Sequence, residues 1–339
     1  MGDLTTGVGF ALLAGLMLGL YALPQKYVKN FSEENTWGLF FLLTMFVVPL
    51  IATFGIMSGI AQVFSTLSPK TLTIIVVSSF LWGTGVMMWG KAIHHIGVSL
   101  GFSLFIGTVI LVGSLLPFFV DGVPEGPAFS AIIIGLLFML AGIIANGRAG
   151  MLRERDEQAS GEAGGAVTSM AKGISIAISG GLLATGFSLA NAVGRPPLHE
   201  ASLAQGNPEW VTALAVMFPI FLSGGVVMTL YFAWQLTSNK SWANFKTPDL
   251  GKNISLIAVM AFFHYAASAV FAYAAFNLGA AGNTVGYAIF NTACVVTAIV
   301  SGLLTGEWRQ ASAKAKNTLY AGLVCMVMGV LVISLANTL

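Results

Sequence analysis

The chain has 339 residues, of which 56% are hydrophobic and only 8% are charged, and its formal net charge is +2. Soluble domains carry about 25% charged residues, so this composition excludes a water-soluble protein of this size. The few positive charges are scattered between apolar runs and form no block that would suit nucleic acid.

Apolar runs long enough to cross a membrane recur along the whole chain. A bilayer core of about 30 Å requires roughly 20 mostly apolar residues in a helix. Ten runs meet this requirement, at residues 5–24, 37–58, 71–92, 98–120, 129–147, 172–194, 210–236, 254–277, 281–303 and 317–337. We therefore predict ten transmembrane helices, with long helical hairpins and fewer crossings as the alternative.

Lysine and arginine residues predict how these spans are oriented. With ten spans, 13 of the 15 Lys and Arg residues lie on one side, and only Lys70 and Arg195 lie on the other. The positive-inside rule places the 13 in the cytoplasm, and an even number of spans then places both termini outside it. No Lys or Arg precedes the first run, which favours a retained span over a cleaved signal peptide.

A polar stretch, RERDEQASGEAGGAVTSMAK (residues 153–172), interrupts the spans at the middle of the chain. It divides the sequence into a first five-helix repeat (1–150), a cytoplasmic linker (151–171) and a second five-helix repeat (172–339). A shift of 182 positions places Phe80 on Phe262, which supports the two halves. Because each half has an odd number of spans, we predict an all-α membrane protein with a 5+5 inverted-repeat bundle, an architecture typical of secondary transporters.

Polar and aromatic residues inside the spans are candidates for a binding site, because polar groups in hydrocarbon require partners. Amide and phenol groups suit the hydroxyls of a sugar, and an aromatic ring suits its C–H face. Each such residue has the alternative of simply pinning two helices together. The substrate-binding candidates are Tyr21, Gln25, Lys26, Trp82, Trp89, Asn191, Tyr265, Tyr287 and Asn291.

His264 is the one titratable candidate for proton coupling, because no Asp, Glu, Lys or Arg lies near the middle of any span. Its alternative role is a neutral histidine that hydrogen-bonds across two helices. His199 and Glu200 on the outer side, and Glu307 on the cytoplasmic side, are candidates for gates. Ordinary solvated loop charges are the alternative for these three.

Signatures of enzymes and cofactor sites are missing from the sequence. It contains no GxxxxGK[ST] or HExxH motif and no CxxC pair. We therefore predict a protein that is not an enzyme and that uses no cofactor or metal. The predicted partners are a small sugar, protons and the lipid bilayer, without nucleic acid, and the sequence does not indicate an oligomeric state.

Five segments carry a resemblance to a known family. They are FLWGTGVMMWGKAIHHIGVSLGFSLFIGTVILVGSLLPFFVDG (80–122), GRAGMLRER (147–155), PQKYVKNFSEENTW (24–37), NAVGRPPLHEA (191–201) and GEW (306–308). Together they resemble, in order and over essentially the whole chain, the L-rhamnose–proton symporter family of the drug/metabolite transporter superfamily. Lys26, Trp82, Asn191, His199 and Glu200 stand at positions that match this family.

The resemblance implies a 5+5 inverted-repeat bundle that takes up a deoxy-sugar with protons across a bacterial inner membrane. The stretch FFHYAASAVFAYAAFNLG (262–279), which contains His264, departs most from the family pattern and leaves the exact sugar open. We therefore predict a secondary active transporter for L-rhamnose or a related monosaccharide, working by proton symport and alternating access.

The sequence leaves three other functions open. One is an exporter of amino acids or amphiphilic small molecules, which a wide apolar cavity without convergent Asn and Tyr would favour. The others are a non-transporting membrane sensor or assembly subunit and an ion channel.

Overall fold

The computed structural model describes residues 4–116, 118–123, 126–159, 170–306 and 308–335. Within these ranges the secondary structure is entirely helical. The first part of the chain forms α1 (Leu4–Leu20), η1 (Leu23–Tyr27), α2 (Glu33–Leu42), η2 (Leu43–Val47), α3 (Val48–Ile56), α4 (Ile60–Ser65), α5 (Pro69–Leu115), α6 (Phe118–Asp121) and α7 (Pro127–Ala159). The second part forms α8 (Met170–Ala184), α9 (Gly186–Ala204), α10 (Val211–Ser238), η3 (Ser241–Phe245), α11 (Leu250–Asn277), η4 (Gly279–Ala281), η5 (Gly282–Gly286), α12 (Tyr287–Leu304) and α13 (Ala313–Leu335).

Nine helices within the described ranges are long and apolar enough to cross a membrane. They are Thr5–Tyr27, Glu33–Ile56, Pro69–Ile93, Pro127–Asp156, Met170–Ala204, Val211–Ser238, Leu250–Asn277, Gly282–Leu304 and Ala313–Ser334. These match nine of the ten predicted runs in place. The predicted span at 98–120 corresponds to a shorter apolar helix, Leu100–Leu115.

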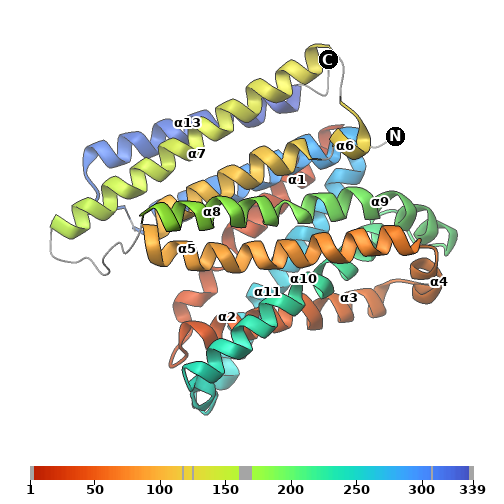
Figure 1. Ribbon diagram of the computed structural model, residues 1–339, viewed down its shortest axis with the longest axis horizontal. Helices are drawn as coiled ribbons and strands as arrows, with labels where there is room; N and C mark the ends of the chain where they lie inside the picture. The colour runs from red at the N-terminus through yellow and green to blue at the C-terminus, as the bar shows by residue number, and fades with distance from the viewer. Residues whose placement is uncertain (1–3, 117, 124–125, 160–169, 307, 336–339) are drawn as a thin grey trace.

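α5 contains two antiparallel arms and is not one straight helix. A Cβ added to Gly101 would lie 3.6 Å from the backbone nitrogen of Ile93, eight positions earlier. In a straight helix, residues eight apart are separated by about 12 Å along the axis. The chain therefore reverses between the arms Pro69–Ile93 and Leu100–Leu115, and Figure 1 shows these arms in two shades of orange.

The helices pack in pairs that join distant parts of the chain. α1 lies against α11 and α12, whereas α8 and α9 lie against the two arms of α5. The span formed by α2, η2 and α3 packs on α10, and α7 packs along α13 (Figure 1). α1 begins and α13 ends at the same end of the bundle (Figure 1).

Glycines allow the closest of these approaches. A Cβ added to Gly15 of α1 would lie 2.6 Å from the carbonyl oxygen of Phe290, and one added to Gly19 would lie 2.8 Å from that of Cys294. Between α7 and α13, a Cβ on Gly142 would lie 2.7 Å from the oxygen of Gly322. Small residues at such contacts are typical of helix packing in membranes, where apolar burial alone gives little drive for association.

We expect Gly15→Ala to destabilise the protein by about 1–3 kcal/mol, because the added methyl group overlaps the backbone of α12. Gly9→Ala is a matched control on the same helix, since a Cβ there would meet no atom within 4 Å. Thermal unfolding in detergent, followed by tryptophan fluorescence, measures both variants. Equal melting temperatures for the two variants would contradict the packing described for α1.

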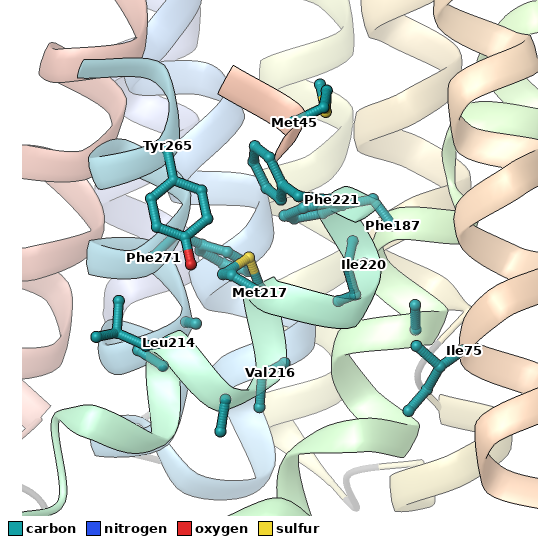
Figure 2. Close-up of a cluster of buried hydrophobic side chains, with 14 of the residues drawn as sticks. Met45, Ile75, Phe187, Leu214, Val216, Met217, Ile220, Phe221, Tyr265 and Phe271 are labelled. Atoms are coloured by element: carbon teal, nitrogen blue, oxygen red, sulfur yellow. The ribbon is translucent and has the colours of Figure 1, made fainter. Parts of the chain in front are cut away.

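The surface of the bundle is apolar, and its interior holds many of the polar side chains. Ile51, Leu230 and Leu304 are 68%, 65% and 83% exposed, which is expected of helices that face lipid. Asn191 and Asn283, in contrast, are fully buried. The main core lies between α2, α5, α9, α10 and α11, and part of it is drawn in Figure 2.

Candidate functional site

Phe221 of α10 is the centre around which three predicted site residues gather. Its fully buried ring has centroid distances of 5.5 Å to Trp82, 5.7 Å to His264 and 5.0 Å to Tyr265. Figure 2 shows Tyr265 and Phe187 on either side of Phe221. The arm of α5 that carries Trp82 therefore meets α11 across a single phenylalanine of α10.

His264 lies half-buried between α1, the α2–η2 span and α10. Its Nδ1 is 3.1 Å from the hydroxyl oxygen of Thr44, which belongs to the π-helical segment η2. The rings of Tyr21 and Phe40 lie 5.0 and 5.3 Å from the imidazole, both edge-on. The structure thus brings the predicted proton-coupling residue together with Tyr21.

A second aromatic contact joins Trp82 to the start of α12. The ring centroid of Phe187, in α9, lies 5.2 Å from that of Trp82 and 6.3 Å from that of Tyr287. The Tyr287 ring fits against Gly113, where an added Cβ would lie 2.5 Å from its Cε1 atom. Asn291 is buried one turn later, and its amide nitrogen donates to the carbonyl oxygen of Tyr287 at 2.9 Å.

Asn191 and Asn283 form a buried amide pair beside this aromatic contact. Nδ2 of Asn191 donates to Oδ1 of Asn283 at 2.7 Å. Oδ1 of Asn191 is buried and has no hydrogen-bond partner among the described residues. An unpaired buried acceptor lowers the stability of the folded protein by about 1–3 kcal/mol. This oxygen is therefore suited to accept a hydrogen bond from a hydroxyl group of a bound molecule.

Tyr265 offers a further buried hydroxyl near Phe221. It is 2% exposed, and in the described part of the chain neither its hydroxyl nor that of Thr53 makes a hydrogen bond of normal geometry. Trp82, Tyr265 and the Asn191 amide oxygen thus provide one aromatic face and two unpaired oxygens inside the bundle.

Three predicted residues lie apart from this group. Gln25 and the exposed Lys26 follow α1, where Gln25 donates to Glu33 at 3.4 Å and Lys26 to Thr305 at 3.4 Å. Trp89 stacks on Phe105 at 5.8 Å, and its indole N–H is buried without a partner among the described residues.

A cavity of about 230 Å³ lies between α5, α7, α12 and α13, away from Phe221. Phe102, which contacts Trp89 at 5.9 Å, lines it, as do Asn146, Arg153 and Trp308. The guanidinium of Arg153 lies 5.1 Å over the Trp308 ring. Two of the segments that carry the family resemblance, GRAGMLRER (147–155) and GEW (306–308), supply lining residues of this cavity.

The predicted gate residues have different surroundings. His199 of α9 contacts the Thr212 hydroxyl at 2.9 Å, and its ring lies 4.3 Å from Phe276 of α11. Glu200 is exposed, and Glu307 lies outside the described residues. His199 therefore joins α9, α10 and α11 near the ends of those helices.

Several residues of the site were missed by sequence reasoning. Phe221, Phe187 and Phe40 are three of 24 phenylalanines, and nothing in the sequence distinguishes them. Thr44 and Asn283 carried a usable signal, because each is a polar side chain inside an apolar span. Within the described residues, no cluster of three His, Cys, Asp or Glu side chains is placed to hold a metal ion.

A multi-pass, all-helical membrane protein with aromatic rings and amide groups buried together at its centre has the build of a small-solute transporter. The family model described as L-rhamnose-proton symport protein matches residues 2–338. The chain belongs to this family, a family of transporters, which agrees with the resemblance and with the predicted proton-coupled uptake of a sugar.

Curated relatives match over nearly their full length. An L-rhamnose-proton symporter of Cronobacter sakazakii is 23% identical over 342 residues, which cover 98% of this chain and 97% of the relative. Proteins of the same name from Escherichia coli and Shigella boydii are 23% identical over 337 residues, with 96% of each chain covered.

Proposed function

We propose that this protein takes up L-rhamnose or a related monosaccharide together with protons, by alternating access, across a bacterial inner membrane. Membership of the L-rhamnose-proton symport protein family supports the reaction class. The observation that carries the proposal is the group around Phe221, where a tryptophan face, a histidine and the unpaired, buried hydroxyl of Tyr265 meet.

The packing supports a ten-span bundle of two inverted repeats, residues 1–150 and 172–339, joined by a linker at 151–171. With Leu100–Leu115 counted as the fourth span, the first span packs on the eighth and ninth, and the sixth packs on the third and fourth. The second packs on the seventh, and the fifth packs on the tenth. Exchanging the two halves leaves this list of pairs unchanged, as a repeat within the drug/metabolite transporter superfamily would.

An even number of crossings fits the common end at which α1 begins and α13 ends (Figure 1). Together with the Lys and Arg distribution, this supports extracytoplasmic termini and a cytoplasmic linker. α7 extends to Ala159, so the first residues of the linker continue the fifth helix.

In the proposed site, Trp82 and Phe221 would face the C–H groups of the sugar, and Oδ1 of Asn191 would accept one hydroxyl. Tyr265 and Tyr287 provide further contacts, with Asn291 behind Tyr287. The remaining predicted residues keep roles on the route to and from this site: Tyr21 beside His264, Trp89 near the side cavity, Gln25 and Lys26 at the cytoplasmic end, and His199, Glu200 and Glu307 as gates.

Uptake into proteoliposomes with a panel of labelled sugars tests the proposal. We expect L-rhamnose or a close relative to accumulate when the outside is more acidic, and we expect accumulation to stop when a protonophore collapses the gradient. Failure of every sugar to accumulate under any gradient would refute sugar symport. Export of amino acids or amphiphiles in the same vesicles would instead support the exporter alternative.

A further inference from the structure

The hydroxyl oxygen of Thr44 makes two contacts of equal length with α11. It lies 3.1 Å from the carbonyl oxygen of Ala261 and 3.1 Å from Nδ1 of His264. Ala261 and His264 are three residues apart, so they lie on one face of α11. Thr44 thereby joins the π-helical segment η2 of one span to a single face of another.

These contacts decide which imidazole nitrogen carries hydrogen. A carbonyl oxygen only accepts, and a threonine hydroxyl has one hydrogen to donate. If that hydrogen pointed at Nδ1, two oxygens would face each other at 3.1 Å with no hydrogen between them. The hydroxyl therefore donates to Ala261 and accepts from Nδ1–H of His264. A neutral imidazole has one N–H, so its lone pair is left on Nε2.

Nε2 lies in an aromatic surround. The rings of Tyr21, Phe40 and Phe221 border the imidazole, and no hydrogen bond from a described residue reaches Nε2. α1 and α10 contain no charged residue, and α11 contains one, Lys252 in its first turn.

Few titratable groups on the neighbouring elements bear on this atom. On α2, Glu33 is the acceptor for Trp37 and Glu34 is the acceptor for Asn239, both in the first turn. The ring centroid of Tyr21 lies 5.0 Å from that of the imidazole, and Tyr265 follows His264 on α11; both side chains are phenols. The helix η1, which packs against α11, adds Lys26 and Tyr27. In the described part of the chain, none of the helices packed around Nε2 therefore supplies a carboxylate beside it to compete for a proton.

We propose that Thr44 is a positioning residue that fixes His264 as the Nδ1–H tautomer. Nε2 is then the atom that takes up the transported proton or accepts a hydrogen bond from a sugar hydroxyl. The inference rests on the proposed symport. A hydronium ion on the outer side gives up its proton, so that an O–H bond breaks and an N–H bond forms at Nε2. Release to water on the cytoplasmic side reverses the step.

This arrangement lets His264 change charge without turning. In the imidazolium both nitrogens are donors, so Nδ1–H continues to donate to Thr44 while Nε2 gains its hydrogen. The opposite tautomer would present N–H to the aromatic surround and require the ring to break its bond with Thr44 before taking a proton.

Magic-angle-spinning NMR of [15N]histidine-labelled protein in proteoliposomes tests the tautomer directly. We expect a pyrrole-type signal from Nδ1 and a pyridine-type signal from Nε2 of His264 at a pH where the ring is neutral. The spectrum of H264Q identifies these signals among those of the four histidines. A pyrrole-type Nε2 in the wild-type protein would overturn the proposal.

Two substitutions at Thr44 distinguish the effect of its hydroxyl group from the effect of its side-chain shape. Thr44→Val keeps the side-chain volume and removes the hydroxyl oxygen that accepts from Nδ1–H. We therefore expect the Nδ1–H tautomer of His264 to fall below half of the neutral population. Thr44→Ser keeps the hydroxyl and should preserve the wild-type spectrum. An unchanged spectrum in Thr44→Val would show that Thr44 does not set the tautomer. If Thr44→Val fails to fold, Thr44→Ala serves as the second hydroxyl-free variant, and the wild-type spectrum remains decisive.

The result is independent of the transport assay, because the spectra are recorded without sugar or gradient. Failure of sugar uptake with the expected tautomer would refute the proposed function alone. Uptake with the opposite tautomer would refute only the role of Thr44. In a separate measurement, adding a transported sugar should shift the Nε2 signal of His264 equally in Thr44→Ser and in the wild-type protein.

Discussion

His264→Gln is expected to abolish accumulation of sugar against its gradient while leaving exchange of sugar across the membrane intact. A pH difference of one unit drives about tenfold accumulation when one proton moves with each sugar, equal to about 1.4 kcal/mol. Glutamine keeps a polar side chain between α1 and α10 but cannot take a proton. The accumulation ratio should therefore fall from about tenfold to unity.

Counterflow of labelled sugar into preloaded proteoliposomes measures exchange in the same preparation, and a pH-sensitive dye reports proton entry. His95→Gln is the matched control, because it makes the same substitution at a histidine that packs against Gly173 of α8 and has no ring contact with Phe221 in the described structure. Tenfold accumulation by His264→Gln would remove His264 from the coupling mechanism.

Asn191→Ala is expected to weaken sugar binding about 5- to 150-fold. A sugar hydroxyl that loses its buried acceptor is left unpaired, which costs about 1–3 kcal/mol. The substitution also removes the 2.7 Å bond to Asn283, so the protein should lose some thermal stability as well. The half-saturating sugar concentration in counterflow measures the first effect.

Asn146→Ala separates loss of binding from loss of stability. Asn146 is equally an asparagine inside the bundle, its Nδ2 is 3.0 Å from the sulfur of Met326, and its Oδ1 is also buried without a partner among the described residues. It belongs to α7, apart from the Phe221 group. If both variants weaken sugar binding to the same extent, Asn191 has no specific part in recognition.

The sequence predicted the spans well because length and hydropathy are local properties. Nine predicted runs coincide with apolar helices of sufficient length in the described ranges. The fourth run was harder to predict, because the third and fourth spans both belong to α5 and the chain reverses direction between them. A continuous apolar run records where helix is favoured but carries little information about where the axis turns.

The candidate site was predicted only in part. Polar residues such as His264 and Asn191 could be recognised as candidates because burying a polar side chain in an apolar span is costly and therefore rare. Which residues they contact could not be predicted, because Thr44 and Phe221 become neighbours of His264 only when the second, seventh and eighth spans pack together. Trp82 and Trp89 were both predicted to bind substrate, yet Trp82 meets Phe221 whereas Trp89 stacks on Phe105.

The glycine face of α1 has a consequence for how the protein is made. Gly15 and Gly19 are synthesised at the start of the chain, but the backbone they fit against, from Phe290 to Thr297, leaves the ribosome near the end. Until then this face of the first helix has lipid or an insertion factor as its neighbour. Completion of the bundle is therefore a late, long-range step, and chains that stop before α12 leave the Gly15 and Gly19 face of α1 uncovered, although α11 can still pack beside it.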